Sequence, residues 1–204
     1  MKAIDERNKN KSKAMGGFAH GVTGIGWALT HLARATGSAR YEQLAQEAFA
    51  FQDALFDEQE QTWRDLRKLG GATTIAAWCH GAVGIGLAHL DLHSTLSQAS
   101  TRKSRRRAAA AAWRMGMGWN HCVCHGDLGA WELLNHAIAA GEAPKELSSA
   151  NLLDIILTSL EQDGPSCSAE LRTVAAPGRD VEEDADHGER AKLMILELHT
   201  SFRR

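Results

Sequence analysis

The stretch that decides the fold is Cys79-His80-Gly81-Ala82-Val83-Gly84-Ile85-Gly86, because its pattern recurs twice more along the chain. Residues 19–24 and residues 124–129 repeat it, and each copy reads x-His-Gly-x-x-Gly. An apolar run with the spacing of a helix follows each copy. Glycine allows a positive φ and a close approach of another backbone or a ligand. The repeat therefore predicts helices that each begin at a glycine-rich turn.

A second kind of helix is predicted between these copies. Residues 41–56 and residues 151–160 carry apolar side chains at i, i+3 and i+4, which is the pattern of an amphipathic helix. The helices after the glycine-rich turns are apolar almost all round, which suits an inner position, and the amphipathic ones suit an outer position. With 3 prolines and 19 glycines, the chain has few helix breakers and many flexible points. We expect an all-α fold of helical hairpins.

The repeated turns place histidine and cysteine at equivalent positions. If the hairpins stand around one axis, the turns lie at the same end and these side chains converge. The alternative is a small-residue packing device, as in α-solenoids, but solenoid turns do not usually carry His and Cys at one position. The chain has 4 cysteines and no export signal, so metal ligands or reactive thiols are favoured over disulfides. The converging residues would be His20, Cys79, His80, Cys124 and His125.

Composition excludes several classes of protein. The chain has 204 residues, 44% hydrophobic and 24% charged, which is ordinary for a globular domain and excludes collagen-like and wholly disordered chains. No apolar run approaches the roughly 20 residues of a membrane helix, and residues 1–14 lack the apolar stretch of a signal peptide. We therefore expect a cytoplasmic protein without a membrane span. The basic run 102–107 has no interleaved aromatic residues, so we interpret it as a solvated helix face and expect no nucleic-acid partner.

Four motifs follow one another in a characteristic order: residues 17–25, Trp63-Arg64-Asp65-Leu66-Arg67, residues 78–85 and residues 120–129. This set resembles the lanthionine synthetase C-like proteins, and most of all the carboxy-terminal cyclase domain of the class II lanthipeptide synthetases. The resemblance covers roughly residues 16 to 140. It implies a partial α/α toroid of helical hairpins, with the glycine-rich turns and a zinc ion at one end.

The resemblance also implies roles for single residues. It makes Cys79, Cys124 and His125 the zinc ligands and His20 the active-site histidine. Three protein ligands leave the fourth place on zinc to a substrate thiol, which remains nucleophilic as a thiolate. The implied reaction adds a peptide cysteine thiolate to a dehydroalanine or dehydrobutyrine, which closes a thioether ring, and His20 handles the proton. Further candidates lie near these motifs: His80, His121 and Asp127 to orient ligands, and Asp65 and Arg67 beside a peptide groove.

For some of these residues a structural role is the alternative. Asp127 suits the start of its own helix as a carboxylate near the helix N-terminus. Asp65 and Arg67 suit an ordinary surface ion pair. A single cysteine is usually a small apolar residue, and this is the interpretation we favour for Cys122 and Cys167.

The expected organisation is a polar segment at 1–15, a partial cyclase domain at 16–162 and a polar, acid-rich, disordered tail at 163–204. From the resemblance to a complete cyclase domain, we expect this chain to lack the hairpins before residue 16 and the last glycine-rich helix. The expected partners are a dehydrated precursor peptide and a companion chain that carries the missing hairpins or a dehydratase. One alternative is a truncated, inactive remnant that binds zinc and peptide. Another is a eukaryotic-type relative that joins glutathione to dehydrated residues, and the Trp63 to Arg67 motif favours the bacterial type.

Overall fold

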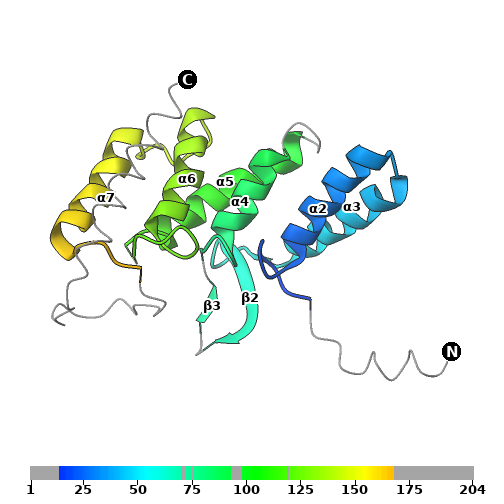
Figure 1. The fold of residues 1–204 in the computed structure, drawn as a ribbon, viewed down its shortest axis with the longest axis horizontal. Coiled ribbons are helices and arrows are strands. Elements are labelled where there is room, and N and C mark those ends of the chain that lie inside the picture. The colour runs from blue at the N-terminus through cyan, green and yellow to red at the C-terminus, as the bar shows by residue number, and fades with distance from the viewer. Residues whose placement is uncertain (1–13, 70–71, 75, 93–97, 119, 168–204) are drawn as a thin grey trace.

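In the computed structural model, three helical hairpins stand side by side (Figure 1). The structure describes residues 14–69, 72–74, 76–92, 98–118 and 120–167. The hairpins are α2 (Val22–Thr36) with α3 (Ala39–Ala54), α4 (Ala82–Asp91) with α5 (Gln98–Met115), and α6 (Asp127–Ala139) with α7 (Ser149–Asp163). Each predicted helix is found, so the sequence pattern places the hairpins correctly.

The helices that follow the glycine-rich turns form the inner row. Helix α4 contacts both α2 and α6, and each of these three packs against the next helix of its own hairpin. Seven of the ten residues of α4, including Val83 and Ile85, are buried. Helix α6 buries eight of its thirteen residues. The predicted division into inner and outer helices is confirmed.

A small sheet, which the all-α expectation did not include, connects the first hairpin to the second. Strands β1 (Phe56–Asp57), β2 (Thr62–Leu69) and β3 (Ala72–Thr74) are antiparallel in the order β1-β2-β3. The Asp57 carboxylate accepts the Gln59 N–H at 2.9 Å and so stabilises the turn from β1 to β2. Trp63 on β2 is 2% exposed and joins the main core. The sheet forms because its aromatic side chains pack against the hairpins.

Helix α5, which carries the basic run 102–107, is packed against its neighbours, and several of its arginines are paired instead of facing solvent alone. Ala108, Ala109, Ala111 and Ala112 are fully buried, because alanine lets neighbouring helices approach closely. On the same helix, Arg105 donates from Nε and Nη2 to the two carboxylate oxygens of Glu142, at 2.7 and 2.6 Å. Further arginines of α5 bind the turn between β1 and β2: Arg107 pairs with Glu58 and covers the Phe56 ring, and Arg114 donates to the Glu60 and Gln61 carbonyls. The basic run therefore ties elements together.

Most of the expected tail and most of the expected N-terminal segment lie outside the described residues. Helix α7 continues to Asp163, and residues 164–167 are described after it. Within the described part of the chain, every helix is too short or too polar to cross a membrane.

Candidate functional site

Backbone hydrogen bonds join the three glycine-rich turns at the position before each histidine. The Ala19 N–H donates to the Cys79 carbonyl at 2.9 Å. The N–H groups of Trp78 and Cys79 both donate to the Cys124 carbonyl, at 2.8 and 3.3 Å. Equivalent positions of the three repeats therefore lie in one row, and the predicted convergence of the turns is confirmed.

The last glycine of each repeat is required by this close packing. A Cβ atom at Gly84 would lie 1.9 Å from the carbonyl oxygen of Trp78. The equivalent contacts at Gly24 and Gly129 would measure 2.3 and 2.1 Å, again to a backbone oxygen. No side chain can occupy such a position without moving the backbone, so the repeated glycine serves the turn itself.

The convergence brings two predicted zinc ligands into contact. The Cys79 and Cys124 thiols lie close enough to interact, and both are half-buried. Burial, together with the neighbouring Cys124 thiol, raises the pKa of Cys79 to about 11. A thiol with this pKa is neutral at pH 7 unless a nearby cation stabilises its thiolate.

His125, the third predicted ligand, lies on the same turn. Its Nδ1 is 4.0 Å from the Cys122 sulfur, and its Nε2 is buried without a partner among the described residues. Two cysteines and a histidine are residue types that bind zinc, so the chemistry of these side chains fits this metal. The described residues do not bring three His, Cys, Asp or Glu side chains into one metal-binding group. The structure therefore places the two thiols together and His125 beside Cys122.

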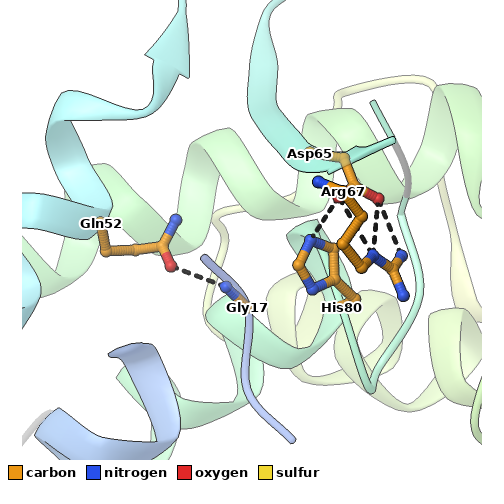
Figure 2. Close-up of polar contacts among 5 residues, drawn as sticks. All are labelled: Gly17, Gln52, Asp65, Arg67 and His80. Carbon is orange, nitrogen blue, oxygen red and sulfur yellow. Dashed lines mark hydrogen bonds and ion pairs between the residues drawn. The ribbon is translucent and has the colours of Figure 1, made fainter. Parts of the chain in front are cut away.

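A network of polar contacts surrounds His80, the residue that follows Cys79 (Figure 2). His80 Nε2 is 3.0 Å from Asp65 Oδ1, and the Arg67 guanidinium binds both oxygens of Asp65 at distances from 2.8 to 3.1 Å. The side chains of His80 and Asp65 are 2% and 5% exposed. Asp65 and Arg67, predicted either beside a peptide groove or as an ordinary surface ion pair, form an ion pair in which Asp65 is buried and contacts His80.

The neighbours of Asp65 and His80 determine the charge that each of these two side chains carries. Burial alone would raise the Asp65 pKa, but hydrogen bonds from Arg67 and the nearby His80 outweigh burial and lower it. Burial lowers the pKa of His80, and Arg67 and His20 act in the same direction against the attraction of Asp65. Asp65 is therefore ionised and accepts the Nε2–H of a neutral His80. The other ring nitrogen, Nδ1, is buried and has no partner among the described residues.

His20 lies at the rim of this site. It is exposed and close enough to His80 to affect it electrostatically. The loop before it is fixed at Gly17, whose N–H donates to Gln52 Oε1 at 2.9 Å (Figure 2). A Cβ at Gly17 would lie 2.9 Å from the Cα of His80, and its φ of +90° also favours glycine. The structure therefore brings His20 beside His80 and leaves it open to solvent.

Gln52 is a site residue that the sequence analysis missed. Its side chain is fully buried and also accepts the Thr23 hydroxyl at 2.5 Å. A signal was present, because Gln52 follows the buried Ala45 and Phe49 at helical spacing on α3. A glutamine on the buried face of an amphipathic helix needs a partner, and here the partner is the turn before His20.

The two remaining candidates hold other parts of the chain. Asp127 is the first residue of α6, and its Oδ1 accepts the Gly118 N–H at 2.8 Å. This agrees with the alternative of a carboxylate at the start of its own helix. His121 lies 3.2 Å from the Ser159 hydroxyl on α7 and accepts the Ser166 N–H at Nδ1, at 3.0 Å.

Sequence comparison identifies the class of protein. The chain belongs to the family of lanthionine synthetase C-like proteins, whose sequence profile matches residues 1–168. It is 27% identical over 145 residues to the lacticin 481/lactococcin biosynthesis protein LcnDR2 of Lactococcus lactis subsp. lactis, over 66% of this chain and 15% of that protein.

Structural comparison agrees with this family. Nisin cyclase matches 80% of this chain with a TM-score of 0.51 and 19% identity, and the match covers 50% of the nisin cyclase chain. This likeness concerns the fold alone. It confirms the predicted fold class, a partial α/α toroid built of helical hairpins. The chain spans half the length of this structural relative and a smaller part of the curated one.

Proposed function

We propose that residues 16–162 are the cyclase part of a lanthipeptide synthetase. The proposed reaction adds a cysteine thiolate of a dehydrated precursor peptide to a dehydroalanine or dehydrobutyrine of the same peptide. The observation that carries this proposal is the contact between the Cys79 and Cys124 thiols, in a row of turns that also holds His20. Membership of the lanthionine synthetase C-like family supports it.

In this proposal Cys79, Cys124 and His125 hold a zinc ion. When bound, zinc would stabilise the peptide cysteine as a nucleophilic thiolate near neutral pH. The chain's own contribution is the alignment of the two thiols, since the Cys124 carbonyl receives the N–H of Cys79. The buried His80 keeps this turn in place through Asp65, so a substrate thiol meets a preformed site.

The proton is assigned to His20. Ring closure forms the carbon–sulfur bond and leaves an enolate, and the proton lost by the cysteine thiol must reach the α-carbon. His20 is exposed at the rim, so it can accept the proton of the cysteine thiol and donate a proton to the α-carbon of the enolate. His80 is less suited to this role, because its Nε2–H is bound by Asp65 and its Nδ1 is buried.

Zinc content tests the ligand assignment. The purified chain should contain about one zinc per molecule, and Cys79→Ala and Cys124→Ala should each lose most of it. Cys122→Ala is the matched control, because Cys122 lies on the same turn outside the assigned set, and it should keep its zinc. Equal zinc in all four proteins would remove Cys79 and Cys124 from the site.

Cyclisation of a dehydrated precursor peptide tests the activity. Ring closure does not change the mass, so free thiols are blocked and counted, and a reaction without protein sets the background. We propose that a companion chain with further hairpins or a dehydratase completes the cytoplasmic enzyme, and the assay is run with and without it. Zinc binding with no cyclisation in either case would favour the second candidate, an inactive zinc- and peptide-binding remnant.

A further inference from the structure

The segment that follows α7 returns to the turn that carries Cys122 and Cys124. We call residues 164–167 the strap. The His121 N–H donates to the Ser166 carbonyl at 2.7 Å, and the Ser166 N–H donates to His121 Nδ1 at 3.0 Å. His121 also lies 3.2 Å from the Ser159 hydroxyl of α7. One histidine therefore holds the strap and the end of the third hairpin against the cysteine turn.

The strap brings a second pair of thiols together. The Cys167 thiol lies close enough to the Cys122 thiol to interact with it, and Cys124 is near enough to act on Cys167 electrostatically. Cys167 is exposed and Cys122 is half-buried, so the interpretation of Cys167 as a small core residue is wrong. The 4 cysteines of the chain thus gather in one region as two pairs. Cys122 precedes α6 and Cys167 follows α7, so the third hairpin separates them in the sequence.

We propose that Cys122 and Cys167 are a redox-sensitive thiol pair that closes to a disulfide and fastens the strap to the cysteine turn. A disulfide requires two sulfur atoms that are already held side by side, and the two hydrogen bonds of His121 supply this restraint. This inference does not rest on the proposed function, since it requires neither zinc nor catalysis.

The oxidant is a small disulfide such as oxidised glutathione. The exposed Cys167 attacks it first, which forms a mixed disulfide and releases one reduced glutathione. The Cys122 sulfur then attacks the Cys167 sulfur and releases the second glutathione. Two protein thiols lose two electrons and two protons, and one oxidised glutathione becomes two reduced molecules. Cys79 and Cys124 are both half-buried, so the oxidant reaches Cys167 more readily than either of them.

Peptide mapping tests the inference. The purified chain is incubated with oxidised glutathione, remaining thiols are alkylated, and the digest is analysed by mass spectrometry without reduction. The expected product links Cys122 to Cys167 and raises the midpoint of thermal unfolding by about 5 °C or more, because the bond closes a loop around the third hairpin. Cys122→Ser should instead retain glutathione on Cys167, and Cys167→Ser should form neither product.

A variant that loosens the strap tests whether the disulfide forms because the strap holds Cys167 beside Cys122. His121→Ala removes the hydrogen bond to the Ser166 N–H, so the disulfide should form about tenfold more slowly while Cys167 still accepts glutathione. Circular dichroism shows whether this variant is folded, and Ser166→Pro removes the same donor if it is not. A bond between Cys79 and Cys124, or a stable glutathione adduct on Cys167 of the unaltered chain, would overturn the proposal.

Discussion

Two histidines of the site differ in what their surroundings allow them to do. His80 is buried and bound to Asp65, whereas His20 is exposed at the rim of the same turns. A residue that exchanges protons with a substrate must reach it, and a residue that supports the site must stay fixed. This difference supports our proposal that His20 transfers the proton, and we propose that His80 supports the cysteine turn.

The first prediction concerns His20. His20→Asn should keep its zinc and bind the peptide, while the rate of ring closure falls by about 10²-fold or more, because a positioned acid–base group is lost. Cys79→Ala should lose zinc and ring closure together. The rates are compared by thiol counting on a dehydrated peptide. Unchanged cyclisation by His20→Asn would make His20 a packing residue.

The second prediction concerns the repeated glycine. Gly84→Ala places a Cβ 1.9 Å from a backbone oxygen, so we expect a loss of about 3 kcal/mol in the free energy of unfolding. Gly37→Ala is the matched control, since nothing lies within 4 Å of its Cβ and only its φ of +68° is unfavourable, which costs about 1 kcal/mol. Urea unfolding measures both. Equal costs would mean that the turn relaxes easily.

At the scale of elements, helix α4 carries a buried histidine away from the turns. Both ring nitrogens of His89 lack a partner among the described residues, and its ring centroid is 5.1 Å from that of Phe49 on α3. Burial, with a smaller effect of Arg105, lowers the pKa of His89 to about 4. Arg105 is itself paired with Glu142, so the inner helix is packed against a fixed ion pair. A neutral His89 is therefore part of the native packing.

The third prediction is a loss of stability in mild acid. In the unfolded chain, histidine has a pKa of about 6.5, so between pH 6.5 and 4 the unfolded state holds a proton that the folded state lacks. Stability is complete above pH 6.5 and falls as the pH drops, by about 2 kcal/mol at pH 5. Denaturant unfolding at pH 7.5 and pH 5 measures this. His89→Phe should remove most of the difference in stability between the two pH values. An unchanged difference would show that His89 does not cause the loss.

At the scale of the whole molecule, the row of hairpins leaves one inner helix uncovered. Helix α2 lies at the end of the row (Figure 1), and Ile25 and Leu32 on it are 57% and 40% exposed. Ala28 and Ala35 are also exposed at helical spacing with them. The buried helix α4, by contrast, is covered on both sides within the inner row, by α2 and by α6. Exposed apolar stripes of this kind favour association.

The fourth prediction follows from this stripe. The chain should self-associate with rising concentration, and Ile25→Lys combined with Leu32→Lys should shift it toward the monomer. Leu157→Lys on α7 is the matched control, because Leu157 is 39% exposed and lies outside the stripe. Sedimentation velocity gives the distribution of species. A monodisperse monomer of the unaltered chain at every concentration would contradict the prediction.

The sequence by itself determined the repeated unit of this protein. The x-His-Gly-x-x-Gly pattern located the turns, because a glycine beside a backbone oxygen and an apolar run at helical spacing are local requirements. The order of the motifs indicated the family. The helices, their inner and outer positions and the row of Ala19, Cys79 and Cys124 followed from this repetition alone.

Only the tertiary structure decided which side chains meet. The contact of Asp65 with His80, the support of Gly17 by Gln52 and the pairing of Cys122 with Cys167 all join segments that are distant in the sequence. The first of these contacts depends on the sheet between the first two hairpins, and the last depends on the return of the strap. Neither the sheet nor the strap has a periodic signal. A local pattern fixes the conformation of a segment, whereas the partner of a buried polar group is fixed by how whole hairpins pack.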